Sequence, residues 1–104
     1  MPKIVAIHKE NDCLQRVRYR YSVATPVTRD ILVQFSEREI YAVQVFDATH
    51  LLPHAKMPFK IQRRDDQFLI SGAIGLDYLT VAYTKSGQWQ GMVAHVEEVI
   101  RCLP

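Results

Sequence analysis

Three arginines alternate along residues 15–23, at Arg16, Arg18 and Arg20. In a β-strand, residues two apart project from the same face about 6.8 Å from each other. This is close to the phosphate spacing of an extended single nucleic-acid strand, and a guanidinium binds phosphate through two parallel hydrogen bonds. The row is therefore compatible with contact with a nucleic acid or an acidic protein, but a solvated sheet face is the simpler explanation of the same pattern. Three further basic residues would extend the patch if their strand lies beside this one: Lys60, Arg63 and Arg64.

Histidine and cysteine are too scattered to predict a metal site. His50 and His54 flank a proline in the irregular segment 47–58, while His95 and Cys102 lie seven residues apart near the C-terminus. Zinc is held by three or four nitrogen or sulfur ligands at about 2.0–2.3 Å. The chain contains neither a CxxC nor an HExxH motif. We therefore expect no bound metal and no other cofactor.

The residues best placed for enzymatic chemistry follow a glycine-containing segment. Gly72 and Gly75 have neither the phosphate-loop nor the dinucleotide-binding spacing, so a bulge or a barrel corner explains them more simply. A small-molecule site between this segment and residues 47–58 is an alternative. Its candidate pocket residues are His50, His54, Gly72, Gly75, Asp77 and Tyr78. No catalytic motif supports this alternative, and we expect a non-catalytic domain.

Composition indicates one globular domain, spanning residues 1–104. Hydrophobic residues make up 48% of the chain and charged residues 23%, which are ordinary values for a folded protein. The net charge of +2 neither requires nor excludes a polyanionic partner. The apolar run after Met1 is too short for a signal peptide, and no stretch is long enough to cross a membrane. We expect a cytoplasmic protein with free thiols at Cys13 and Cys102.

The segment 86–103 has the periodicity of an amphipathic helix. Seven apolar residues fall within an arc of roughly 120° on a helix of 3.6 residues per turn. They are Trp89, Met92, Val93, Val96, Val99, Ile100 and Leu103. The hairpin-like residues 85–88 and the glycine at position 91 leave a second interpretation open, in which Trp89–Val93 is a last strand.

The remainder of the chain alternates as β-strands do. The predicted strands cover residues 4–8, 15–23, 30–35, 39–46, 59–63, 67–70 and 78–84. A turn at 64–66 would place Ile61 opposite Ile70 in an antiparallel hairpin. We therefore predict an α+β fold, in which a mostly antiparallel β-sheet or small β-barrel of six to seven strands packs against one C-terminal helix.

Aromatic and apolar residues exceed what one sheet face needs. If the helix covers one face, Tyr41, Val43 and Val45 on the other face stay uncovered, unless the sheet closes into a barrel. Exposed apolar patches mark interfaces. The preferred function is therefore a regulatory or accessory domain acting by protein–protein interaction or self-association. We expect a homo-oligomer, with a dimer favoured.

Overall fold

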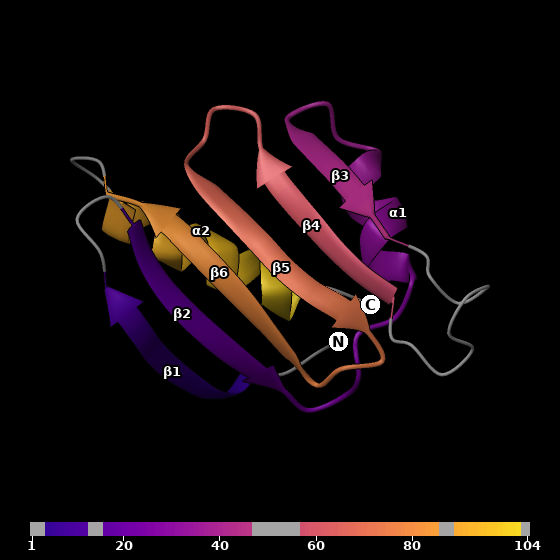
Figure 1. Ribbon diagram of the computed structural model, residues 1–104, viewed down its shortest axis with the longest axis horizontal. Coiled ribbons are helices and arrows are strands. Elements are labelled where there is room, and N and C mark those ends of the chain that lie inside the picture. The colour runs from indigo at the N-terminus through magenta and orange to yellow at the C-terminus, as the bar shows by residue number, and fades with distance from the viewer. Residues whose placement is uncertain (1–3, 13–15, 47–56, 86–88, 103–104) are drawn as a thin grey trace.

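The chain folds as one six-stranded antiparallel sheet with two helices (Figure 1). The structure is a computed structural model that describes residues 4–12, 16–46, 57–85 and 89–102. In chain order the elements are β1 (Ile4–Asp12), β2 (Arg16–Val23), α1 (Asp30–Ser36), β3 (Tyr41–Val45), β4 (Met57–Arg63), β5 (Phe68–Ile74), β6 (Tyr78–Thr84) and α2 (Trp89–Arg101). This confirms the predicted α+β fold with a C-terminal helix.

The sheet is open. Its strand order is β1-β2-β6-β5-β4-β3, so β1 and β3 form the two edges and do not pair with each other. The hairpin register places Ile61 opposite Ile70, as predicted. Pairing of β2 with β6 joins the N-terminal hairpin to the four-stranded meander β3–β6. The barrel alternative is therefore wrong for this chain.

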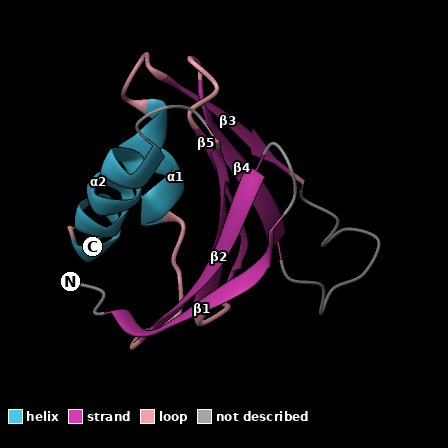
Figure 2. Cartoon of the chain, turned by 90° about the vertical axis from the view of Figure 1, so that its left-hand side faces the viewer, coloured by secondary structure: helices cyan, strands magenta, loops and turns pink. Residues whose placement is uncertain are grey.

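Both helices lie on the same face of the sheet, which we call the core face (Figure 2). Val96 and Ile100 of α2 are fully buried. The other apolar residues on that side of α2 pack against the same core: Trp89, Met92, Val93 and Val99. Trp89–Val93 is thus helical, while Leu103 lies outside the described residues.

Residues 30–35 are helical, and their prediction as a strand is wrong. In α1, Ile31 and Phe35 are buried while Val33 is 56% exposed. Positions i and i+4 share a helix face, whereas i, i+2 and i+4 share a strand face. Ile31 and Phe35 satisfy both periods, and only Val33 distinguishes between them. A short helix therefore replaces the expected seventh strand.

The apolar side chains of β3 also lie on the core face. The prediction that Tyr41, Val43 and Val45 lie on the uncovered face of the sheet is therefore wrong. Tyr41 is 5% exposed, and its ring meets that of Phe35 in α1 edge-on with centroids 4.8 Å apart. Val43 and Val45 lie opposite Ile61 and Phe59, both buried core residues. Tyr41 and Val43 thus pack under the helix layer, because α1 covers the end of the sheet that α2 does not reach.

Two tyrosine hydroxyls lie in the centre of this core. The hydroxyl oxygens of Tyr21 and Tyr83 are 2.6 Å apart, and the Tyr21 hydroxyl donates to a carboxylate oxygen of Glu97 at 3.3 Å. Burial raises the pKa of both hydroxyls well above the ordinary tyrosine value, and the nearby Glu97 charge raises them further. Each hydroxyl therefore stays protonated in the folded protein.

We expect alkaline pH to destabilise the fold through these two tyrosines. An unfolded tyrosine loses its proton near pH 10, whereas Tyr21 and Tyr83 keep theirs when folded. The unfolded state then binds fewer protons, so the free energy of unfolding should fall above about pH 10. The fall is up to about 1.4 kcal/mol per pH unit for each tyrosine. Urea unfolding between about pH 9 and pH 11 measures it.

Matched variants separate this effect from general alkaline damage. Tyr21→Phe with Tyr83→Phe should flatten the pH dependence. Tyr78→Phe removes a hydroxyl outside this cluster and should leave the dependence unchanged. An equally steep fall in the double variant would contradict the assignment.

Candidate functional site: the open face of the sheet

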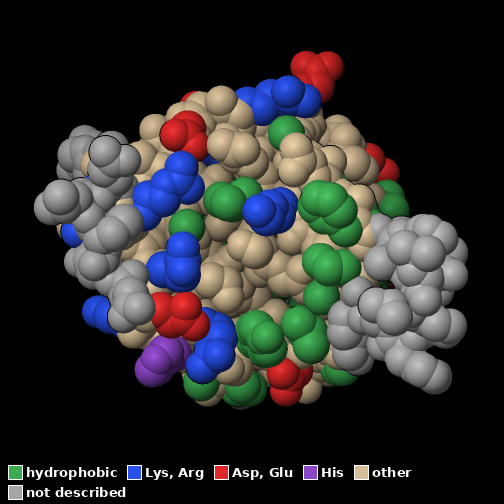
Figure 3. All heavy atoms as spheres, viewed as in Figure 1, with side chains coloured by type: hydrophobic (Ala, Val, Ile, Leu, Met, Phe, Trp, Pro, Cys, Tyr) green, Lys and Arg blue, Asp and Glu red, His purple; other side chains and the backbone are tan. Residues whose placement is uncertain are grey.

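The face of the sheet opposite the helices, which we call the open face, carries the alternate residues of every strand. In β2 the tyrosines at positions 19 and 21 are buried against the core, so Arg18 and Arg20 project from the open face. Figure 3 views this face and shows basic side chains gathered over β1 and β2. The predicted arginine row is therefore present on a surface that neither helix covers.

The arginines differ in their surroundings. Arg16 lies 3.6 Å from Asp66, and Arg20 lies 3.6 Å from Glu10. These side chains are substantially exposed, and exposed ion pairs contribute little to stability. The Arg20 guanidinium also lies over the Tyr78 ring, 5.5 Å from its centroid. Among the described residues, no carboxylate pairs with Arg18.

Only one of the three additional basic residues joins this row on the open face. Lys60 projects from the open face of β4 and has no acidic partner among the described residues. Arg63 is on the core face, where it pairs with Asp65 at 3.1 Å and contacts the sulfur of Met92 at 3.3 Å. Arg64 is in the β4–β5 turn and donates to the backbone oxygen of Glu39.

Strand register arranges the open face in two rows that cross five strands from β2 to β3. The first row carries one cation on β2 and one on β4. The second row carries a cation on β2 only. The first row is Arg20, Thr80, Ser71, Lys60 and Gln44. The second row is Arg18, Ala82, Leu69, Gln62 and Ala42.

A hollow of about 190 Å³ lies at the β3 end of these rows. Its lining combines two apolar side chains, two carboxamides and one ammonium group. These residues are Ala42, Gln44, Lys60, Gln62 and Leu69. Sequence reasoning identified Lys60 but not the other four, because their proximity depends on the pairing of β3 with β4.

The two edges of the sheet hold most of the exposed large hydrophobic residues. Of the six such residues among the described part of the chain, five lie on or directly beside β1 or β3. They are Val5, Ile7, Ile40, Val45 and Phe46. The sixth, Val33, is on the outer side of α1.

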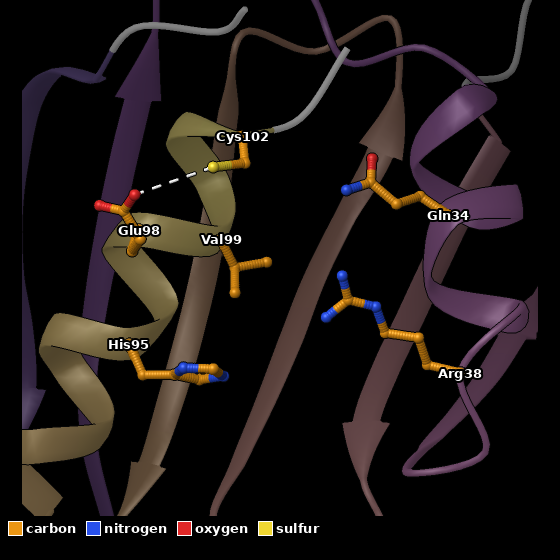
Figure 4. Close-up of a pocket in the computed structure, with 6 residues that line it drawn as sticks. All are labelled: Gln34, Arg38, His95, Glu98, Val99 and Cys102. Atoms are coloured by element: carbon orange, nitrogen blue, oxygen red, sulfur yellow. Dashed lines mark hydrogen bonds between the residues drawn. The ribbon is translucent and has the colours of Figure 1, made fainter.

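A smaller cleft of about 140 Å³ separates the two helices on the other side of the molecule (Figure 4). Gln34 of α1 and Arg38, just after that helix, approach it from one side, while His95 and Val99 face it from α2. The exposed Cys102 thiol contacts Glu98 at 3.8 Å. The cleft therefore combines cationic, acidic and thiol groups without a shared hydrogen-bond network among the residues that the structure describes.

The predicted small-molecule pocket is not assembled by the described residues. Tyr78 lies on the open face and Gly75 is in the β5–β6 turn with a φ of 92°. Gly72 faces the core, where the side chains of Leu79 and Phe59 fill the space beside it. Asp77 is exposed, and its backbone oxygen accepts a hydrogen bond from β2. The remaining two candidates, His50 and His54, are outside the described residues, as is Cys13.

The described residues also bear on two other kinds of site, a metal centre and a membrane span. No group of three or more His, Cys, Asp or Glu side chains in that part of the chain is arranged to hold a metal ion. Neither described helix combines the length and apolar character that spanning a bilayer requires. Comparison with protein-family models, curated proteins and solved structures finds no match to this chain.

The position of Gly72 predicts a packing effect rather than an effect on ligand binding. A Cβ atom there would lie 2.9 Å from Leu79 Cδ2 and 3.1 Å from Phe59 Cζ, and both side chains are almost fully buried. Gly72→Ala should therefore destabilise the fold by about 1–3 kcal/mol, the usual cost of overpacking a core. Urea unfolding measures the change.

Gly91 provides the matched control. A Cβ at Gly91 meets nothing within 4 Å, and the residue is exposed within α2. Gly91→Ala should stabilise the protein by about 0.5–1 kcal/mol because alanine favours the helical backbone. A neutral Gly72→Ala substitution would show that the space beside Gly72 can accept a further group.

Proposed function

We propose that the chain is a non-catalytic protein-interaction domain that self-associates by pairing β3 with β3 of a second copy. The observation that supports this is the character of residues 40–46, Ile-Tyr-Ala-Val-Gln-Val-Phe, which contain no charge and no proline. This segment includes the whole of an edge strand. Natural proteins protect such edges with charges, prolines or bulges, because an unprotected edge pairs with other chains.

The other edge is better protected. β1 has two register shifts, between Ile4 and Ala6 and between Lys9 and Asp12, which distort its outer edge. It also contains a lysine and a glutamate within the strand. In contrast, β3 pairs with β4 in unbroken register from Tyr41 to Val45. The regular, charge-free edge is the one suited to adding a strand.

A second copy fits this edge because the segment is complementary to itself. In an antiparallel pair centred on Val43, Ile40 would lie opposite Phe46 of the partner and Tyr41 opposite Val45 of the partner. No like charges would meet in this register. Aromatic and β-branched residues in facing positions stabilise antiparallel pairs by about 0.2–1 kcal/mol each. The pairing would cover Ile40, Val45 and Phe46, which are 41%, 43% and 62% exposed in the single chain.

The predicted role of β3 as an interface is therefore retained with a different geometry. Tyr41 and Val43 already pack in the core of their own chain, so an uncovered apolar face formed by their side chains is not the contact. The backbone groups of β3 that point away from β4 form it instead, together with the exposed residues at the ends of the strand. The Tyr41 N–H is the exception, because it already donates to the backbone oxygen of Arg38. This interaction needs no uncovered apolar sheet face.

We expect light scattering coupled to size exclusion to give a mass about twice that of the 12.0 kDa chain at a concentration of about 50 µM. Val45→Lys with Phe46→Lys should give a monomer, because the symmetric pair would bring four ammonium groups to one seam. Circular dichroism of the variant checks that it remains folded. A wild-type monomer at this concentration would refute self-association.

Two control variants test the location of the interface. Val33→Lys places a charge on a residue of similar exposure in α1 and should remain dimeric. Ile7→Lys changes the opposite edge and should also remain dimeric. Dissociation of the Ile7→Lys variant, with the β3 variant still dimeric, would assign the contact to β1 and overturn the proposal.

A further inference from the structure

We propose that the open face binds single-stranded nucleic acid, with a base in the hollow between β3, β4 and β5 and phosphates on Lys60, Arg18 and Arg20. This inference does not depend on the dimer, because its residues are side chains of one chain. It rests on three features of the open face: the positions of the cations, the lining of the hollow and the small residues between them.

The cations lie at positions that an extended phosphate backbone can reach. Arg20 and Lys60 occupy the same row three strands apart, which is about 14 Å for strands spaced about 4.8 Å. Arg18 lies two residues from Arg20 along β2. The Arg20 guanidinium lies over the Tyr78 ring, 5.5 Å from its centroid, so an aromatic surface that a base could stack on adjoins this cation.

The ion pairs on this face do not prevent phosphate from binding. Arg20 and Glu10 are 3.6 Å apart, and the Arg20 side chain is 45% exposed. An exposed pair of this kind is weaker than a charge-assisted hydrogen bond to phosphate. Arg18 and Lys60 have no acidic partner to lose among the described residues.

The hollow has the lining that suits a nucleobase. Ala42 and Leu69 provide apolar contacts for a planar ring, while Gln44 and Gln62 offer amide donors and acceptors for its edge. Gln62 donates to Asp66 at 3.0 Å, which fixes the orientation of its carboxamide. Lys60 lines the same hollow, so a base and its own phosphate can be bound together.

The residues between the hollow and the arginines leave room for the chain of a ligand. The intervening positions of the first row are Ser71 on β5 and Thr80 on β6, and both are partly exposed. Small side chains let a sugar–phosphate backbone approach the sheet, and the two hydroxyls can donate to it. An acidic peptide would use the same cations but would gain little from an amide-lined hollow.

Fluorescence anisotropy with a labelled oligothymidylate of about 12 nucleotides tests the proposal on the whole chain at low salt. Arg18→Gln with Lys60→Gln should weaken binding about tenfold or more. The slope of log K against log salt should change from about −2 to about −0.7, because two of three phosphate contacts are lost. These two residues are chosen because their replacement leaves no described carboxylate unpaired.

Arg29→Gln with Arg38→Gln is the matched control for charge. Both arginines are exposed and flank α1 on the helix side, so this variant loses the same two charges from the other side of the sheet. Its affinity and salt slope should stay within about twofold of wild type. Equal weakening in both double variants would mean that binding follows net charge alone, and would overturn the site.

Filling the hollow tests the base contact separately. Ala42→Phe keeps the charge and should reduce oligothymidylate binding about fivefold or more, since stacking of one base contributes about 1–3 kcal/mol. The same variant should bind inorganic polyphosphate, which has no bases, as well as wild type does. Unchanged oligothymidylate binding in Ala42→Phe would refute the base-binding role.

Two further outcomes would overturn the proposal as a whole. One is the absence of oligothymidylate binding at low salt with the dimeric or monomeric protein confirmed as folded. The other is tighter binding of polyglutamate than of oligothymidylate, which would identify an acidic protein as the partner for this face.

Discussion

Tyr21 and Tyr83 bring two hydroxyl groups into the centre of the core, and the arrangement of the whole sheet provides their partners. Buried hydroxyls are costly unless they are hydrogen-bonded. Here each hydroxyl bonds to the other, and the Tyr21 hydroxyl also bonds to Glu97. The two tyrosines are 62 residues apart and come from neighbouring strands, while Glu97 comes from α2. The contact therefore requires β2 beside β6 and the C-terminal helix across both.

This single cluster connects the N-terminal hairpin β1–β2, the meander β3–β6 and the helix α2. The ring of Tyr19 packs beside both of the others, with its centroid 6.3 Å from that of Tyr21 and 5.6 Å from that of Tyr83. α1 and α2 share the core face, so neither helix covers the opposite face, and within the described residues β1 and β3 each pair with a neighbour on one side only. The two proposed binding surfaces are consequences of that one-sided packing. The helices cover the most aromatic side of the sheet, and the opposite side carries a mixture of basic, polar and apolar side chains (Figure 3).

The sequence predicted correctly those elements whose residue pattern fits only one type of secondary structure. In residues 16–23 polar and apolar or aromatic side chains alternate, so the faces of β2 were predictable. The face on which Arg63 lies was predictable too. Arg63 is three residues from Lys60 in the same strand, and residues an odd number of positions apart project from opposite faces. Ile31 and Phe35 fit both a strand and a helix, and only the exposure of Val33 distinguishes them. The hollow could not be predicted, because Gln44 meets Lys60 only through a register that the intervening residues determine.

The two proposals use different groups of the same strand and do not compete. Edge pairing would use the outward backbone groups of β3, whereas the hollow uses the side chains of Ala42 and Gln44 on the open face. A two-fold axis perpendicular to the sheet would keep both open faces on one side and bring the two hollows to the seam of a twelve-stranded sheet. One oligonucleotide spanning both hollows would then gain affinity from the second contact without any new type of interaction. By linkage, such a ligand would strengthen the dimer by the same factor as the dimer strengthens its binding.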